Sequence, residues 1–65
     1  MKIMLNGKPA ETSAATLADA LAELGYAEAQ VATAVNEEFV PKSKRKGHML
    51  SPGDRVEVVA PRQGG

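Results

Sequence analysis

The 65-residue sequence contains no cysteine, no tryptophan and a single histidine. Without cysteine there is no disulfide framework, no thiolate metal site and no thiol nucleophile, and one histidine cannot form a zinc or copper cluster. We therefore expect no metal site. No apolar run approaches the roughly 20 residues of a membrane span, and the N-terminus does not resemble a secretory signal. These absences predict a cytoplasmic protein with no membrane partner.

The residues present are sufficient for one small domain. Apolar residues make up 43% of the chain, but many of them are alanine, and folding a chain of this size buries only about 60% of its surface. Eight basic and eight acidic residues cancel, yet half of the basic ones stand together in the segment Lys42 to Lys46. The two aromatic residues, Tyr26 and Phe39, are too few for the stacking platforms of single-strand binders. We therefore interpret the basic segment as a solvated loop and expect no nucleic-acid partner.

The N-terminal quarter predicts a β-hairpin. In the segment from Lys2 to Leu5, residues 3 and 5 share an apolar face, and Asn6-Gly7 favours a type I′ turn. Lys8 to Thr12 should return antiparallel to the first strand. Pro9 cannot donate a ladder hydrogen bond, so this second strand should lie at a sheet edge.

A short helix is predicted after the hairpin, with Thr16 as its N-cap. Apolar residues then recur with helical spacing, and Gly25 is placed to end the helix; the stripe consists of Leu17, Ala20, Leu21 and Leu24. A helix this short is unstable alone, so its leucines must pack against a sheet.

The remainder of the chain predicts three more strands, at Val31 to Val35, Glu38 to Val40 and Arg55 to Ala60. Pro52 and Gly53 favour a type II turn before the last of these strands. Strands with a helix on one face define an α+β fold of two layers. We predict a β-grasp arrangement, a mixed sheet of four to five strands packed on one helix, and we consider a small open barrel the weaker alternative.

The sequence offers no plausible catalytic constellation. His48 is the only ready general base and follows a run of cations, and the serines occupy cap or turn positions without an evident base beside them. Glu37-Glu38 lies in a turn, where adjacent side chains diverge. We therefore predict that the protein is not an enzyme and binds no cofactor.

The unusual feature is the Gly64-Gly65 pair at the end of the sequence. Pro61 should stop the last strand, so we predict a domain at residues 1–61 and a flexible tail at 62–65. Two final glycines occur by chance with a probability of about 0.5%. An inert frayed end is the competing explanation. A Gly-Gly end lacks Cβ atoms, so it can enter a narrow channel and present its carboxylate to another active site.

With these features in order, the chain resembles the ThiS family, the ubiquitin-like β-grasp sulfur carriers of bacterial thiamine biosynthesis. The resemblance covers the whole length and is carried by Lys2-Ile3-Met4-Leu5-Asn6-Gly7, Ala34-Val35-Asn36, Val40-Pro41, Gly53-Asp54 and Gly64-Gly65. It implies that an E1-like adenylating enzyme uses ATP to activate the Gly65 carboxylate. A cysteine desulfurase or another persulfide donor then supplies sulfur for a terminal thiocarboxylate, and thiazole synthase accepts that sulfur. Gly64, Gln63 and Arg62 would form the arm.

Two alternatives remain open from the sequence. Related β-grasp carriers serve molybdopterin synthesis or tRNA thiolation, and a ubiquitin-like or RNA-contacting module would leave the terminus inert. For the carrier we also predict a partner interface on the outer sheet face. Strand alternation directs Val56 and Val58 toward the helix and leaves Val59 and Met4 on the opposite side.

Overall fold

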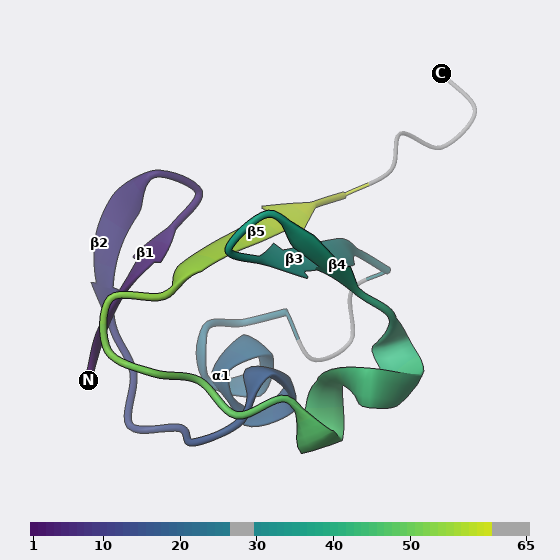
Figure 1. The fold of residues 1–65 in the computed structure, drawn as a ribbon, viewed down its shortest axis with the longest axis horizontal. Coiled ribbons are helices and arrows are strands. Elements are labelled where there is room, and N and C mark those ends of the chain that lie inside the picture. The colour runs from purple at the N-terminus through teal and green to yellow at the C-terminus, as the bar shows by residue number, and fades with distance from the viewer. Residues whose placement is uncertain (27–29, 61–65) are drawn as a thin grey trace.

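The computed structural model describes residues 1–26 and 30–60. Within these residues, five strands and two helices follow one another along the chain (Figure 1). Their bounds are Lys2–Leu5 (β1), Lys8–Glu11 (β2), Leu17–Glu23 (α1), Ala32–Val35 (β3), Glu38–Val40 (β4), Lys42–Gly47 (η1, a 3₁₀ helix) and Arg55–Val59 (β5).

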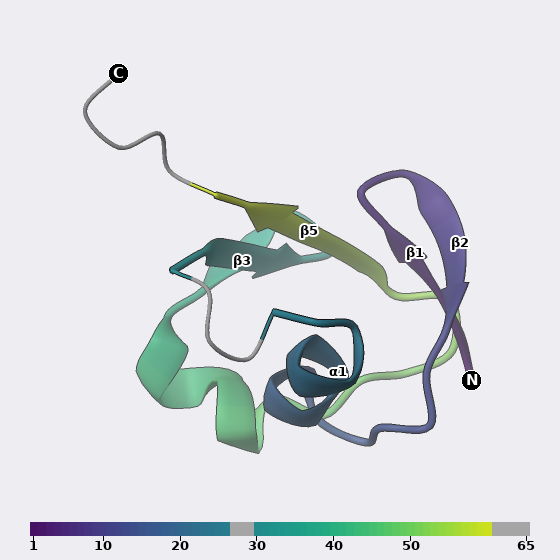
Figure 2. The ribbon, with the colours of Figure 1, turned by 180° about the vertical axis from the view of Figure 1, so that it is seen from behind.

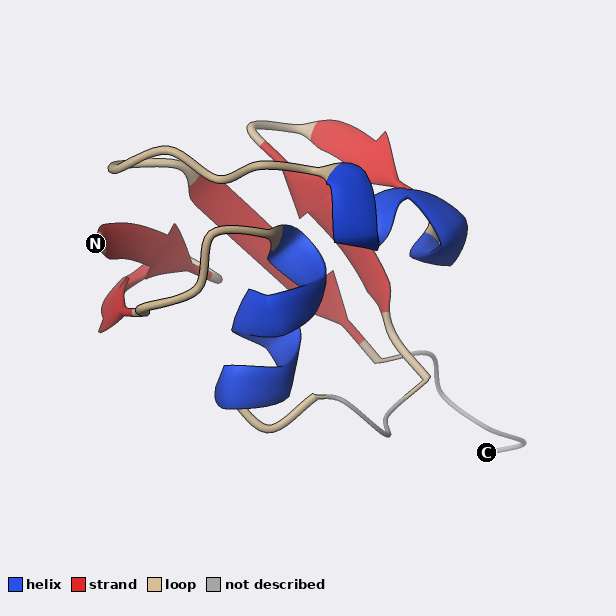
Figure 3. Cartoon of the chain, turned by 90° about the horizontal axis from the view of Figure 1, so that it is seen from below, coloured by secondary structure: helices blue, strands red, loops and turns tan. Residues whose placement is uncertain are grey.

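The strands form one mixed sheet in the order β2-β1-β5-β3-β4. β1 and β5 are parallel, with Met4 opposite Arg55, and all other neighbouring strands are antiparallel. Figure 3 shows both helices in front of the same face of the sheet. Figure 2, which views the molecule from behind, shows α1 below β5 and β3. The predicted α+β class, with a mixed sheet packed on the helix α1, is confirmed. β2, which contains Pro9, lies at an edge as predicted.

The hydrophobic core lies between the sheet and α1. Strand alternation directs Val56 and Val58 inward, where they are 1% and 8% exposed, while Val59 on the other face is 62% exposed. The helix contributes the predicted apolar stripe, although Leu24 is only partly buried. The buried cluster consists of Ile3, Leu17, Ala20, Leu21, Val35, Val40, Leu50, Val56 and Val58.

The caps of α1 follow the sequence closely. Thr16 Oγ1 accepts a hydrogen bond from the Asp19 amide at 3.2 Å. At the other end Gly25 has φ +96°, and the Tyr26 amide donates to the Leu21 carbonyl at 2.7 Å. That bond closes a Schellman motif, which needs a left-handed residue at the position of Gly25. Neither described helix has the length or apolar composition needed to cross a membrane.

The turns adopt the predicted conformations. Asn6 and Gly7 have φ values of 50° and 83°, as a type I′ turn requires. Gly53 has φ 86°, and the Asp54 amide donates to the Ser51 carbonyl at 3.0 Å, in agreement with the type II turn. The strand ends differ from prediction by one residue, since β2 ends at Glu11, β3 begins at Ala32 and β5 ends at Val59.

The interpretation of Lys42 to Lys46 as a solvated loop is wrong in one important respect. The segment forms η1, and the Arg45 side chain is only 9% exposed. Arg45 Nε donates to Thr33 Oγ1 at 3.0 Å and Nη2 donates to the Val31 carbonyl at 2.6 Å. These bonds tie η1 to the start of β3, because a guanidinium can reach several acceptors at once. The three lysines are exposed.

Candidate functional site

The predicted modified residue, Gly65, lies outside the described residues, as do the predicted arm residues Gly64, Gln63 and Arg62. The predicted boundary between residues 1–61 and 62–65 falls in the same segment and stays a prediction. The structure does place β5, the strand that precedes the arm. Val59 is its last residue, and Ala60 is the last residue described.

β5 is the central strand, and side-chain bonds extend its hydrogen bonding. β1 pairs with β5 only through Met4 and Leu5, so it ends before β5 does. Beyond that point Asn6 Nδ2 donates to the Val58 carbonyl at 3.2 Å, and the Val58 amide donates to Asn6 Oδ1 at 2.8 Å. The side-chain amide of Asn6 thus makes the two hydrogen bonds to Val58 that a neighbouring strand would otherwise make. The sequence identified Asn6 as a turn residue only, because this contact spans 52 positions.

A second asparagine supports the other side of β5. The backbone amide of Asn36 donates to the Arg55 carbonyl at 2.7 Å, and the backbone amide of Arg55 donates to Asn36 Oδ1 at 3.0 Å. Asn36 Nδ2 also donates to Asp54 Oδ1 at 3.0 Å. The two turns next to β5 therefore fix both of its edges.

The outer sheet face carries an apolar surface beside the end of β5. Val59 lies opposite Ala32, and Ala34 lies opposite Phe39, which is 69% exposed. With Glu57 and Asn6 these residues surround a shallow hollow of about 240 Å³. We define the outer patch as Ala32, Ala34, Phe39 and Val59. Exposed apolar side chains that gather in this way are typical of interaction surfaces.

Met4 lies on the same face but not in the outer patch. Its register partner is Arg55, four residues before Val59 on β5, which corresponds to roughly 13 Å along an extended strand. Met4 instead lines a second hollow of about 250 Å³ with Gly7, Glu37 and Arg55. The structure therefore brings Val59 together with Phe39, which the sequence analysis missed. Alternation in β4 could have revealed it, because Val40 is buried and Phe39 must point the other way.

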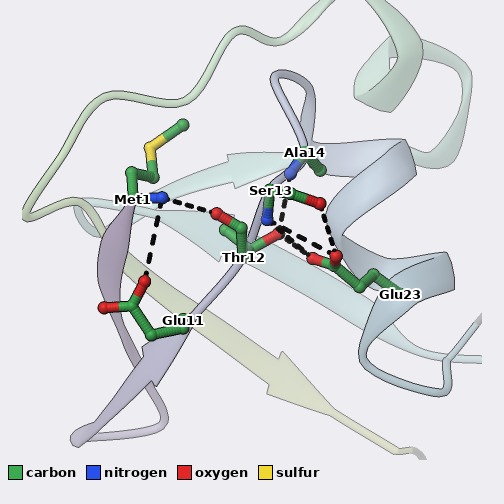
Figure 4. Close-up of polar contacts among 6 residues, drawn as sticks. All are labelled: Met1, Glu11, Thr12, Ser13, Ala14 and Glu23. Atoms are coloured by element: carbon green, nitrogen blue, oxygen red, sulfur yellow. Dashed lines mark hydrogen bonds and ion pairs between the residues drawn. The ribbon is translucent and has the colours of Figure 1, made fainter.

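A polar cluster joins the end of β2 to α1 (Figure 4). The Glu23 carboxylate accepts hydrogen bonds from the Thr12 hydroxyl and from the Ser13 hydroxyl and amide. These donors, Thr12 first, hold the pKa of the Glu23 carboxyl below its ordinary value. The cluster fastens a loop to a helix, and the Ser13 hydroxyl donates to the Glu23 carboxylate at 2.7 Å, a partner that the sequence analysis did not identify. Within residues 1–26 and 30–60, no three acidic or histidine side chains are placed to hold a metal ion.

Comparison with known proteins gives consistent matches. Residues 3–65 match the model of the ThiS family. The sulfur carrier protein ThiS of Thermus thermophilus is 40% identical over 63 residues, which cover 97% of this chain and 98% of that protein. A thiazole synthase of Paramagnetospirillum magneticum is 39% identical over 61 residues, covering 92% of this chain; the chain spans only 19% of that enzyme.

Solved structures agree with the sequence matches. The crystal structure of a thiamine biosynthesis protein (ThiS) from Geobacter metallireducens superposes with a TM-score of 0.83 at 28% identity, and each chain is covered completely. An NMR structure of a thiamine biosynthesis protein from that organism gives 0.78 at 26% identity, covering 100% of this chain and 88% of the other. This likeness confirms the predicted β-grasp fold.

Proposed function

This chain belongs to the ThiS family of sulfur carriers in thiamine biosynthesis, and we propose that the carboxylate of Gly65 carries the sulfur. The observation that carries the assignment is the match to a sulfur carrier protein over nearly the full length of both chains. The family match extends to residue 65 and so includes Gly64 and Gly65.

The carboxylate of Gly65 is a poor electrophile. A carboxylate reacts with a nucleophile only after one oxygen becomes a leaving group, and adenylation by ATP achieves this with release of pyrophosphate. A persulfide sulfur then attacks the Gly65 carbonyl carbon and AMP leaves. The new bond joins this sulfur to carbon, and a thiol then attacks the persulfide's own S–S bond, which forms a disulfide with the donor's inner sulfur and leaves the outer sulfur on Gly65 as a thiocarboxylate. Because the chain has no cysteine, none of its side chains can hold the sulfur as a thiol.

In this proposal the partners supply all the catalysis. An E1-like adenylating enzyme binds ATP, a cysteine desulfurase or other persulfide donor delivers sulfur, and thiazole synthase accepts it. The chain itself is not an enzyme, holds no cofactor and acts in the cytoplasm, where ATP is available. The thiazole synthase of P. magneticum contains a segment similar to this chain, which supports thiazole synthase as the acceptor.

The folded domain would present the arm from a fixed position. Asn6 and Asn36 brace β5 on its two sides, and Val59 pairs with Ala32 at the end of the strand. We propose that the adenylating enzyme and the sulfur acceptor grip the outer patch, with Val59 and Phe39 as anchors and Met4 at the margin. An enzyme that takes the arm into its active site must contact the surface next to that arm.

The covalent proposal is tested by removing Gly65. We expect the shortened chain to keep its fold, seen as unchanged amide NMR spectra for residues 1–60, and to lose ATP–pyrophosphate exchange with the cognate adenylating enzyme. Intact-protein mass spectrometry of the full chain, isolated from its host, should show an oxygen replaced by sulfur. Undiminished exchange by the shortened chain would refute the role of Gly65.

The docking proposal is tested by Val59→Asp, with Ala22→Asp as the control on the exposed side of α1. We expect Val59→Asp to weaken binding to the adenylating enzyme by about 1 kcal/mol or more while stability changes by less than about 1 kcal/mol. Ala22→Asp adds the same charge and should leave binding unchanged. Equal affinity for the two variants in calorimetric titrations would remove the outer patch from the interface.

The alternatives left open by the sequence are less well supported. Molybdopterin synthesis and tRNA thiolation use the same terminal chemistry, but the matches reported above are to ThiS proteins and to a thiazole synthase. An inert terminus would contradict the mass-spectrometric expectation directly.

A further inference from the structure

The face of the molecule opposite the outer patch has a hollow of its own. The hollow lies between α1 and η1 and has a volume of about 220 Å³. Figure 3 shows these two helices on one face of the sheet. The lining residues come from both helices and the segment after α1: Ala18, Leu21, Tyr26, Lys42, Arg45 and Lys46. Three of the six are cationic and none is acidic.

Arg45 makes this hollow unusual. Its side chain is 9% exposed, and both of its hydrogen bonds go to neutral oxygens, those of Thr33 and Val31. Within residues 1–26 and 30–60 the one ion pair joins the Met1 ammonium to Glu11, so no described carboxylate lies within 4.0 Å of the Arg45 guanidinium or of the lysines. A buried charge without a counterion costs free energy, and an anion placed beside it reduces that cost.

The guanidinium also has donors to spare. Nε and Nη2 account for the two described bonds, and no buried side-chain nitrogen in the described part of the chain lacks a partner. The two described bonds use two of the five N–H groups of the guanidinium. Lys42 and Lys46 are exposed, so the lining combines two exposed cations with one buried cation. A planar guanidinium can donate two parallel hydrogen bonds to a carboxylate, and neighbouring ammonium groups add further donors.

The other half of the lining is apolar. Ala18, Leu21 and the ring of Tyr26 form this part, in which the Tyr26 hydroxyl is the one polar side-chain group. The volume is below the roughly 300 to 1,000 Å³ of small-molecule sites, and one tyrosine is not a stacking platform for RNA. The size suits one or two side chains of a protein.

We propose that this hollow docks an acidic segment of a partner protein, in which a carboxylate side chain meets Arg45, Lys42 and Lys46 and a neighbouring apolar side chain covers the half-buried Ala18 and Tyr26. The site lies on the helix side of the sheet, so a partner can occupy it while the outer patch is also engaged. The proposal does not depend on modification of Gly65.

An NMR titration tests the site with a short peptide of alternating glutamate and leucine, using a glutamine-for-glutamate peptide as the control ligand. We expect the acidic peptide to shift the amide signals of Leu21, Tyr26 and Arg45. The double variant Lys42→Gln, Lys46→Gln should bind it about fivefold more weakly. The matched variant Lys2→Gln, Lys8→Gln changes the net charge equally on the distant β1–β2 hairpin and should bind it as the parent does. Arg45 is left intact because it holds η1 to β3.

Four results would overturn the proposal. The acidic peptide could shift none of these signals, or the glutamine peptide could shift them equally. Inorganic phosphate or a uridine oligonucleotide could bind there more tightly than the peptide, which would identify a simple anion site or an RNA surface. The last result concerns Glu28, which lies outside the described residues: if Glu28→Gln tightened peptide binding about fivefold, the chain's own carboxylate would be the occupant of the hollow.

Discussion

Each half of the chain is a hairpin followed by a helix, and the two halves hold their helices by different means. In the first half, α1 buries an apolar stripe against the sheet, with Leu17 fully buried and Leu21 3% exposed. In the second half, η1 is polar throughout, and its one buried side chain is Arg45. The comparison shows that a helix can be attached to the sheet by hydrophobic burial or by the hydrogen bonds of a single buried arginine.

The largest effect is expected in the first half. Leu21→Ala should destabilise the fold by roughly 2 to 4 kcal/mol, because it removes buried methyl groups and leaves a cavity in a small core. Thermal unfolding measures the change. A melting midpoint within about a degree of the parent would show that Leu21 is not part of the core.

Arg45→Met is the corresponding change in the second half. Methionine keeps the apolar stem of the side chain but leaves the Val31 carbonyl without its donor, so we expect a loss of about 1 to 3 kcal/mol. Lys44→Met, on the exposed side of η1, is the control and should change stability by less than about 0.5 kcal/mol. Equal unfolding free energies for the two variants would mean that η1 is not fastened by Arg45.

The turns at Asn6 and Asn36, one in each half of the chain, allow a comparison of the hydrogen bonds that each asparagine makes beside β5. Glycine tolerates φ > 0, so Asn6→Gly removes the two bonds to Val58 with little added strain and should cost about 1 to 2 kcal/mol. Asn36→Gly removes exposed bonds and should cost about 1 kcal/mol or less. Amide hydrogen exchange is the measurement, with faster exchange at Val58 expected in Asn6→Gly alone. The same acceleration in both variants would refute a specific role for Asn6.

Glu37 gives a smaller effect of opposite sign. It has φ 71° in the turn position that corresponds to Gly7, and a left-handed conformation is unfavourable for a residue with a Cβ atom. Glu37→Gly should therefore stabilise the fold by roughly 0.5 to 1 kcal/mol, whereas Gly7→Ala should destabilise it by about as much. Thermal unfolding distinguishes them. A lower melting temperature for Glu37→Gly would show that the Glu37 side chain contributes more than its backbone strain costs.

The smallest effect concerns pH. Hydrogen bonds from Thr12 and Ser13 lower the pKa of the Glu23 carboxyl, so their stabilisation is complete above the ordinary glutamate pKa and is lost as the pH falls through the folded-state value. Glu23→Gln should remove this part of the acid sensitivity. Glu38→Gln, in the other half, should not. Melting temperatures measured from neutral to acidic pH, with the same slope in both variants, would contradict this assignment.

The sequence alone predicted the fold because its local patterns agree with one another. Asn6-Gly7 requires a tight hairpin, Pro9 requires an edge, and Thr16 with Gly25 delimits a helix whose apolar stripe needs a sheet. Phe39 was missed although alternation in β4 places it, because a three-residue strand gives a weak pattern. The role of Arg45 carried no local signal, since a cation within a basic run usually stays in water.

What the sequence determined is therefore what depends on near neighbours: the turn conformations, the helix caps, the inward and outward faces of each strand, and the Gly64-Gly65 pair that suits a carrier. Only the tertiary structure decided which distant groups meet. The Asn6 side chain bonds to the backbone of Val58, Arg45 bonds to the Val31 carbonyl, and Phe39 rather than Met4 lines the same hollow as Val59. The physical reason is that strand order and register bring these residues together, and a long-range pairing is specified by the whole core rather than by any one segment.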